Sequence, residues 1–177
     1  MTPTLETKDL TKFVRDIPDF PKKGIAFKDI TPLLKDPGAF RSAIDAFAAR
    51  YEGRGIRLVA GIESRGFLLA SAVALRLGAG VIPIRKKGKL PHKTLSASYD
   101  LEYGTDSVEI HADAAARGDK VLLIDDVIAT GGTARAACEL IEKLGAEVAG
   151  VAFLIELSFL KGREKLGSRE IFALIGY

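Results

Sequence analysis

The chain has 177 residues, of which 47% are hydrophobic, and this composition is typical of one globular domain rather than a disordered chain. Its net charge of +3 is too small to indicate a dedicated nucleic-acid or membrane binder. There is no secretory signal and no run of about 18 apolar residues, and Cys138 is the only cysteine, so we expect a cytoplasmic protein without a disulfide.

The first third of the chain contains two predicted helices separated by a loop. Residues 4–16 have the spacing of a short amphipathic helix, whereas the prolines in 17–34 predict an ordered loop. Asp36 followed by Pro37 is typical of a helix N-terminus, and apolar residues then recur at helical spacing as far as Tyr51. We therefore expect a long helix to begin at Pro37.

Strands and helices alternate through the rest of the chain. The expected strands cover residues 56–62, 81–85, 120–125, 148–157 and 170–175. The expected helices cover residues 66–80 and 132–147, each with glycine near its end. This alternation predicts an α/β fold with a central, mostly parallel sheet flanked by helices.

Between the second and third of these strands, the pattern changes. Residues 85–98 are polar and basic, which predicts a loop, and residues 99–111 alternate on both sides of Gly104-Thr105-Asp106, which predicts a β-hairpin. We expect this hairpin to project from the sheet rather than to join its centre.

Four clusters of polar residues follow predicted strands. They are Glu63–Gly66, Arg85–Lys89, Asp125–Thr133 and Ser158–Lys161. Because ligands of open α/β sheets bind beyond the carboxyl ends of the strands, the clusters should gather at one edge of the sheet. Two clusters are cationic and one combines acids with glycines, which suits a ligand with several phosphates and hydroxyls.

The sequence VLLIDDVIATGGT at 121–133 is the most informative segment. Its glycines precede a predicted helix, whose free N–H groups and dipole favour a phosphate. Asp125 and Asp126 are acceptors suited to the paired hydroxyls of a ribose. The spacing therefore suggests a ribose 5-phosphate, although a helix cap and a plain tight turn would explain an isolated Asp or Gly pair equally well. Neither a P-loop nor a dinucleotide fingerprint occurs.

Longer stretches of the sequence resemble a known family. VLLIDDVIATGGT is similar to the phosphoribosyl-pyrophosphate signature of type I phosphoribosyltransferases. FPKKGIAFKDITPLL, AGIESRGFLLASAVA, IRKKGKLPHKTLSASYDLEYGTDSVEIH and SFLKGREKLG resemble the adenine-specific members of that family, and the resemblance runs from about Ile17 to the end of the chain.

The resemblance implies a fold, a reaction and partners. The fold is the type I phosphoribosyltransferase fold, with a small hood and a projecting β-hairpin loop. Residues 1–177 would form one domain, in which residues 1–35 are a hood segment that contributes to the base site. The reaction joins adenine to phosphoribosyl pyrophosphate and gives AMP and pyrophosphate, with Mg²⁺. A homodimer is also implied.

The resemblance assigns the sugar and phosphate contacts as follows. Asp125 and Asp126 hold the ribose hydroxyls, and the 5-phosphate is held by Ala129, Thr130, Gly131, Gly132 and Thr133. Mg²⁺ would be carried by the substrate, with no ligand directly from protein side chains, and neither His92 nor His111 has metal-ligand spacing with Cys138.

The pyrophosphate contacts come from two other clusters. Glu63, Ser64 and Arg65 form the pyrophosphate turn, with Arg65 as its main cation and a cis peptide expected between Glu63 and Ser64. Arg85, Lys86 and Lys89 belong to a basic loop that reaches the pyrophosphate, in its own chain or across a dimer interface. Taken alone, Arg65 would be a surface or capping residue and the basic run a solvated loop or a nucleic-acid contact.

The resemblance also assigns the residues that bind the base and the residue that handles its proton. Phe27 stacks on the purine, and the backbone of Ala26 and Lys28 reads its edge, which discriminates an amino from an oxo group. Glu102, with Tyr103 beside it, is the catalytic carboxylate together with the cation Arg65. Without that context, Phe27 would more often be a core residue and Glu102 an exposed hairpin residue.

Two competing functions remain at this point. One is a transferase of the same fold for hypoxanthine, xanthine or orotate, which FPKKGIAFKDI argues against because this hood segment differs most between such enzymes. The other is a phosphoribosyl-pyrophosphate-sensing regulator that binds nucleic acid. The chain has neither a second domain nor a basic face beyond one loop, so we expect no nucleic-acid and no membrane partner.

Overall fold

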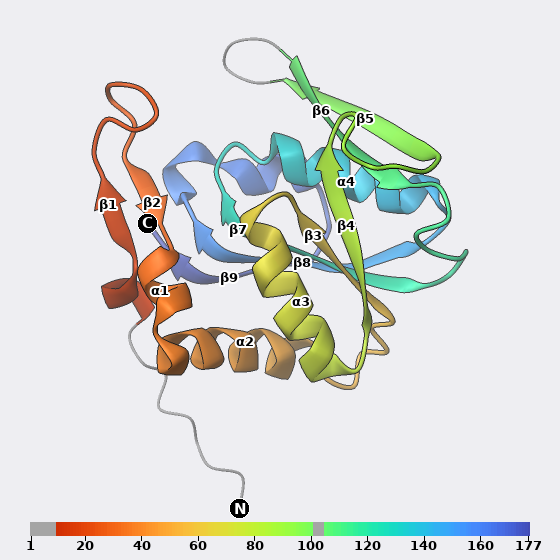
Figure 1. Ribbon diagram of the computed structural model, residues 1–177, viewed down its shortest axis with the longest axis horizontal. Helices are drawn as coiled ribbons and strands as arrows, with labels where there is room; N and C mark the ends of the chain where they lie inside the picture. Colours follow the sequence, from red (N-terminus) through yellow and green to blue (C-terminus); the bar gives the residue numbers. More distant parts are fainter. Residues whose placement is uncertain (1–9, 101–104) are drawn as a thin grey trace, which may run out of the picture.

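The computed structural model describes residues 10–100 and 105–177. Its main feature is a seven-stranded sheet with the strand order β5-β6-β4-β3-β7-β8-β9 (Figure 1). The strands are β3 (Leu58–Ile62), β4 (Gly80–Lys86), β5 (Thr94–Asp100), β6 (Thr105–His111), β7 (Lys120–Ile128), β8 (Glu147–Glu156) and β9 (Ile171–Gly176). The five strands from β4 to β9 in this order are parallel, which confirms the predicted mostly parallel sheet.

Helices cover both faces of the sheet. Along β7, Leu122 and Ile124 pack on one face with α2 (Pro37–Tyr51) and α3 (Arg65–Leu77), because alternate side chains of a strand point to opposite faces. Val121 and Leu123 pack on the other face with α4 (Gly132–Lys143). The central strands are therefore buried on both sides, which explains why they read as continuous apolar runs.

The long first helix begins where the sequence predicts. The side chain of Asp36 accepts a hydrogen bond of 2.7 Å from the backbone N–H of Ala39, and Pro37 occupies the first turn of α2. Residues Ala43, Phe47 and Tyr51 then form the buried face. None of the helices in the described ranges has the length and apolar character needed to span a lipid bilayer.

The predictions for the start of the chain are partly wrong. The helix expected over 4–16 begins outside the described residues, and only a 3₁₀ turn, η1 (Leu10–Phe13), is helical within them. The strand β1 (Arg15–Ile17) follows and pairs with β2 (Phe27–Asp29), which lies in the predicted loop together with the short helix α1 (Thr31–Lys35). This small two-stranded sheet stands apart from the large one and forms the hood (Figure 1).

The hairpin prediction is confirmed, but its boundary is not. The strand β5 begins at Thr94, inside the segment expected to be a loop, and pairs in antiparallel register with β6. Leu95 and Ala97 are alternate residues of β5 that pack against the core. The polar and basic residues 85–93 before them make the whole segment resemble a loop in the sequence. Only Lys86 and Arg85 of β4 pair with β6, so the hairpin lies at the sheet edge and extends beyond it (Figure 1).

Candidate functional site

A pocket of about 600 Å³ lies at the carboxyl ends of the central strands, between them and the hood. Its wall is formed by three of the four polar clusters, by the hood and by the hairpin. The lining residues are Ile25, Ala26, Phe27, Lys28, Ile62, Glu63, Ser64, Arg65, Lys86, Tyr99, Asp125, Asp126, Val127, Ala129, Thr133 and Leu157. This location is the one that the strand order predicts for a ligand site.

The glycine loop after β7 forms a smaller recess of about 100 Å³, which shares Asp125, Val127, Ala129 and Thr133 with the main pocket. Gly131 has φ of +77° and stands at the N-terminus of α4, where no side chain caps the helix. The first N–H groups of α4 are thus available to a ligand, and the positive end of the helix dipole favours an anion. The recess is chemically suited to a phosphate group.

The glycine loop also packs directly on the backbone of a distant segment. A Cβ atom built on Gly131 would collide with the carbonyl oxygen of Gly162, which begins the 3₁₀ helix η3 (Gly162–Leu166). A Cβ atom on Gly162 would in turn collide with the carbonyl oxygen of Ala129. The shape of the loop therefore depends on two facing glycines, of which Gly162 was not identified from the sequence.

Asp125 and Asp126 differ in their surroundings. The backbone N–H of Asp126 donates a hydrogen bond of 2.9 Å to Oδ1 of Asp125. Oδ2 of Asp126 lies 2.6 Å from Nε of Arg65, although it accepts no hydrogen bond of good geometry from the described residues. Burial raises the pKa of the Asp125 carboxyl well above its ordinary value, and the charge of Asp126 raises it further. Burial also raises the pKa of Asp126, an effect that Arg65 opposes.

Replacing Asp125 with asparagine is expected to increase the free energy of unfolding at neutral pH. A carboxyl whose pKa is raised by folding stabilises the protein below its ordinary pKa, and this contribution is lost as the pH rises through the raised value. The gain of Asp125→Asn should therefore be largest at neutral pH and vanish below about pH 4. Urea denaturation at several pH values measures this difference.

Asp106→Asn provides the contrasting control. The contact with Lys86 lowers the pKa of Asp106, so its carboxylate contributes stability above its ordinary pKa that is lost as the pH falls. This variant should be less stable than the wild type at neutral pH. A loss of stability at neutral pH in Asp125→Asn would contradict the raised pKa of Asp125.

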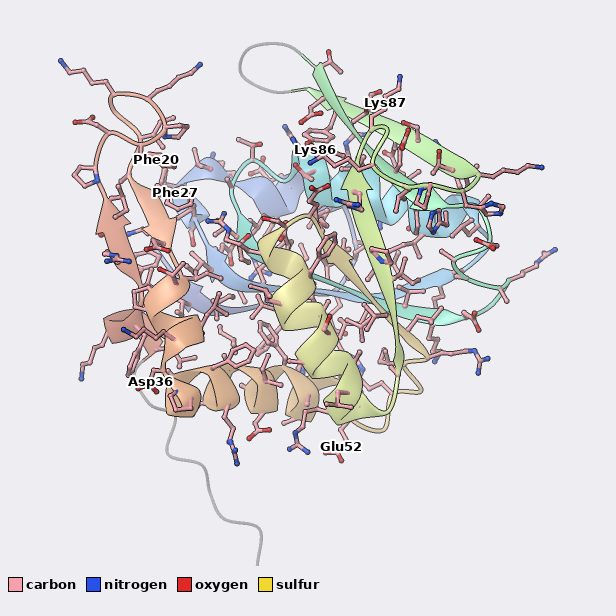
Figure 2. All side chains as sticks on the ribbon, in the orientation of Figure 1. Phe20, Phe27, Asp36, Glu52, Lys86 and Lys87 are labelled. Atoms are coloured by element: carbon pink, nitrogen blue, oxygen red, sulfur yellow. The ribbon has the colours of Figure 1, made fainter. Side chains whose placement is uncertain are left out.

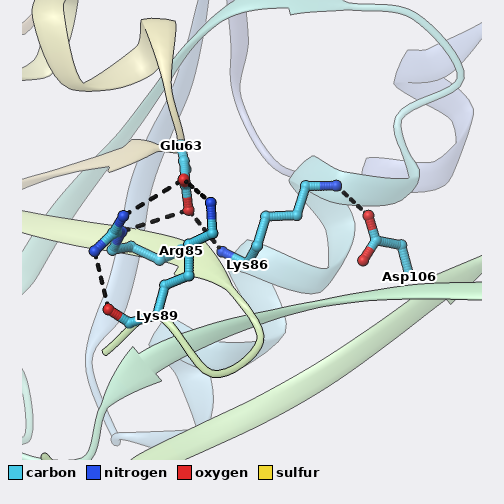
Figure 3. Close-up of polar contacts among 5 residues, drawn as sticks. All are labelled: Glu63, Arg85, Lys86, Lys89 and Asp106. Atoms are coloured by element: carbon cyan, nitrogen blue, oxygen red, sulfur yellow. Dashed lines mark hydrogen bonds and ion pairs between the residues drawn. The ribbon is translucent and has the colours of Figure 1, made fainter. Parts of the chain in front are cut away.

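The turn after β3 is tied to the basic loop. The Glu63–Ser64 peptide bond is cis, as expected. The Glu63 carboxylate accepts hydrogen bonds from Nζ of Lys89 at 2.9 Å and from the backbone N–H of Lys86 at 3.0 Å, and it lies 3.4 Å from Nε of Arg85 (Figure 3). Although burial opposes the change, these donors lower the pKa of Glu63. Its carboxylate thus holds the basic loop against the turn.

Lys86 is the cation of the basic loop that reaches the pocket wall. Its ammonium group forms an ion pair with the carboxylate of Asp106 on β6 (Figure 3). The same carboxylate accepts a hydrogen bond of 3.1 Å from the hydroxyl of Tyr99. The contact with Asp106 raises the pKa of Lys86. Arg85 and Lys89, by contrast, do not line the pocket, because Glu63 binds them.

The hood closes the other side of the pocket with Phe27. The Arg65 guanidinium lies 4.7 Å from the centroid of the Phe27 ring, and Phe20 packs edge-on against the same ring with centroids 5.3 Å apart. Figure 2 places both phenylalanines on the hood, across from Lys86 at the end of β4. Arg65 therefore connects the aromatic ring of the hood with the acid pair near the end of β7.

The structure thus brings most of the predicted site residues together. Ala26, Phe27, Lys28, Glu63, Ser64, Arg65, Lys86, Asp125, Asp126, Ala129 and Thr133 line the main pocket, and Thr130, Gly131 and Gly132 line the recess beside it. Glu102 and Tyr103 lie outside the described residues. Residues 158–161 line neither cavity, although Leu157 does.

Five lining residues were not identified from the sequence, namely Ile25, Ile62, Tyr99, Val127 and Leu157. Val127 lies within the segment 121–133, and the other four lie within or directly beside segments that resemble the family. Their position next to predicted site residues is the signal that could have identified them. Within the described ranges, no group of three or more His, Cys, Asp or Glu side chains could hold a metal ion.

Comparisons with known proteins agree on one family. A family model described as phosphoribosyl transferase domain matches residues 30–170. The adenine phosphoribosyltransferase of Roseiflexus sp. (strain RS-1) is 57% identical over 171 residues, which cover 97% of this chain and 99% of that protein.

Two crystal structures are similar as well. The adenine phosphoribosyltransferase of Thermoanaerobacter pseudethanolicus has a TM-score of 0.92 and 53% identity, and the match covers 95% of this chain and 98% of that one. The Saccharomyces cerevisiae enzyme, in complex with adenine and an imino-altritol bisphosphate, has a TM-score of 0.89 and 44% identity, with coverage of 93% and 95%.

Proposed function

Because the chain belongs to the phosphoribosyltransferase family, we propose that it transfers the 5-phosphoribosyl group of phosphoribosyl pyrophosphate to adenine and forms AMP and pyrophosphate. The fold is the type I phosphoribosyltransferase fold, and the enzyme is a pentosyltransferase of purine salvage. One observation carries the proposal. The recess of the glycine loop adjoins the main pocket, which is also lined by the hood residues Ala26, Phe27 and Lys28.

The sugar and its phosphate would be held by the end of β7 and the glycine loop that follows it. The N–H groups at the start of α4, with the hydroxyls of Thr130 and Thr133, suit the 5-phosphate. Asp125 and Asp126 are acceptors in the adjoining main pocket, where Asp125 also lines the recess, and they suit the ribose hydroxyls. Burial raises the pKa values of both acids, and such perturbed carboxyls are common at functional sites.

The pyrophosphate would lie against the turn after β3. Ser64 and Arg65 line the pocket there together with Lys86, and the two cations Arg65 and Lys86 suit a leaving group with several negative charges. Glu63 carries a negative charge and is bound to the basic loop, so we propose that it contributes through its backbone and by holding Arg85 and Lys89. Whether Arg85 and Lys89 reach the pyrophosphate stays a prediction.

Adenine would bind against Phe27, whose ring faces the pocket beside Arg65. Backbone groups of Ala26 and Lys28 would read the edge of the base. Displacement at the anomeric carbon passes through an oxocarbenium-like state, and N9 of adenine loses a proton as it attacks. The proposed acceptor of that proton, Glu102, and its neighbour Tyr103 rest on the family resemblance alone.

The residues of the pocket fit a Mg²⁺ ion that enters with the substrate. Mg²⁺ is commonly held by one or two carboxylates, by water and by substrate phosphates rather than by an all-protein cage. The described residues offer no cluster of three ligands, and Oδ2 of Asp126 is buried against Arg65, so substrate phosphates and water would hold most of the ion's coordination sphere. When bound, the ion would neutralise charge on the pyrophosphate leaving group.

We further propose a single domain over residues 1–177, with residues 1–35 as the hood of the base site, a cytoplasmic location and a homodimer. Leu68, Leu75 and Val81 support the dimer, because they are exposed apolar residues on α3 and on the neighbouring β4, and Leu75 is 84% exposed. Sedimentation velocity would give the mass of two chains, and the mass of one chain would contradict this part of the proposal.

The reaction itself can be tested directly. Incubation of the protein with phosphoribosyl pyrophosphate, Mg²⁺ and adenine is expected to form AMP and pyrophosphate in equal amounts, measured by chromatography and by a coupled phosphate assay. Omission of adenine should abolish both products. Failure to form AMP with all three components would contradict the proposed function.

A further inference from the structure

The ammonium group of Lys28 contacts two residues, Asp16 and Tyr177, that do not line the pocket. Its side chain is only 12% exposed, which is rare for lysine unless the charge is paired. Nζ lies 2.6 Å from Oδ1 of Asp16 on the paired strand β1 and 3.6 Å from the centroid of the Tyr177 ring. Lys28 therefore forms an ion pair and a cation–π contact at the same time.

Tyr177 is in turn fixed to the large sheet through its backbone. Its N–H donates a hydrogen bond of 2.9 Å to the carbonyl oxygen of Glu156, and its own carbonyl oxygen accepts one of 2.9 Å from the N–H of Ser158. Glu156 ends β8, directly before Leu157 of the pocket wall. Figure 1 shows the chain end beside β2. The contact between Lys28 and Tyr177 thus connects the hood to the sheet.

The hood needs such a connection because it has little internal support. It consists of two strands of three residues each, and an isolated pair of strands is only marginally stable in water. Phe27 immediately precedes Lys28, and successive side chains of a strand point to opposite faces. A side chain that anchors Lys28 from outside therefore also sets the position of Phe27 over the pocket.

We propose that Tyr177 is a positioning residue of the base site. Its ring receives the Lys28 ammonium group and fixes β2, so that Phe27 and the backbone of Ala26 and Lys28 keep the geometry needed for the base. The consequence for the base rests on the proposed function. The consequence for the hood, a slower opening of β2, does not depend on any ligand.

The test compares Tyr177→Leu, which removes the aromatic ring, with Tyr177→Phe, which keeps it. In the protein without ligand, Tyr177→Leu should increase the hydrogen-exchange rate of the amides of residues 27–29 about tenfold, and Tyr177→Phe should leave it near that of the wild type. The amides of β7 serve as an internal reference and should not change. Equal exchange at residues 27–29 in all three proteins would overturn the proposal.

Steady-state kinetics test the consequence for the base. Tyr177→Leu should raise the KM for adenine about tenfold, with kcat and the KM for phosphoribosyl pyrophosphate close to wild type, and Tyr177→Phe should restore the wild-type KM. Lys28→Met, which also removes the ion pair with Asp16, should raise the KM for adenine at least as much as Tyr177→Leu, and the double variant should be no worse than Lys28→Met. A parallel rise in both KM values, or independent effects of the two substitutions, would overturn the proposal.

The two kinds of failure can be distinguished. If the wild-type protein forms no AMP from adenine, the proposed function fails, whereas the exchange rates still decide whether Tyr177 fixes the hood. If the wild type is active and Tyr177→Leu changes neither the exchange nor the KM for adenine, the positioning role fails and the proposed function stands.

Discussion

Replacement of Gly131 with alanine is expected to reduce kcat/KM for phosphoribosyl pyrophosphate by roughly a hundredfold, the loss that a misplacement of about 1 Å can cause. At φ of +77°, an L-residue costs about 1–2 kcal/mol. The new Cβ atom would also collide with the carbonyl oxygen of Gly162. The loop must therefore move away from η3, and the N–H groups at the start of α4 move with it. Initial rates of pyrophosphate release at varied substrate concentration measure the effect.

A matched control separates the collision from the backbone strain. Gly118 has φ of +83°, and a Cβ atom added to it would meet nothing within 4 Å, so Gly118→Ala has the same dihedral cost without a collision. It should lose stability in urea denaturation and keep its kcat/KM. Gly162→Ala should resemble Gly131→Ala, because its Cβ atom would collide with Ala129 from the opposite side. Wild-type activity in Gly131→Ala would contradict the role of the close approach.

Replacement of Arg65 with methionine is expected to lower kcat/KM for phosphoribosyl pyrophosphate by about 10²–10³-fold, as for the loss of a donor to developing negative charge. Arg65 is the side chain that contacts both Asp126 and Phe27, at 2.6 Å and 4.7 Å. Methionine retains most of the packing volume but removes the charge and the hydrogen-bond donors. The pKa of Asp126 should rise further, since Arg65 opposes the effect of burial.

Arg76→Met is the control on the same helix. Arg76 forms an exposed ion pair of 2.8 Å with Asp45 of α2, and exposed pairs contribute little to stability. This variant should keep wild-type kinetics, which would show that the loss in Arg65→Met comes from the pocket rather than from α3. Arg65→Lys should recover only part of the activity, because lysine lacks the planar fork of donors. Full activity in Arg65→Met would exclude Arg65 as the main cation of the pyrophosphate site.

The central sheet and the place of the site could be predicted from the sequence. Apolar runs such as 121–124 end at polar clusters, and parallel strands bring their carboxyl ends to one edge, so Ser64, Arg65, Asp125 and the glycine loop were expected to meet. The resemblance added the hood residues around Phe27, for which local pattern gives no signal. Their roles toward substrate stay predictions.

Other features depend on contacts that no local pattern contains. The strands β1 and β2 have three residues each, too few for periodicity to distinguish them from a loop. The partners of Lys28 and Arg65 come from distant parts of the chain, and the requirement for glycine at 162 follows only from the backbone of Ala129 facing it. The sequence predicts that Arg85 and Lys89 belong to a loop that reaches the pyrophosphate, and it gives no signal for the ion pairs that both form with the Glu63 carboxylate.

Base selectivity is the most direct test of the account. The protein would be given phosphoribosyl pyrophosphate and Mg²⁺ with adenine, hypoxanthine, guanine, xanthine or orotate, one at a time, and pyrophosphate release would be followed. We expect release with adenine alone, because we propose that the backbone of Ala26 and Lys28, which line the pocket with Phe27, reads the amino edge of the base. Release with another base and not with adenine would contradict the assignment of the hood as an adenine reader.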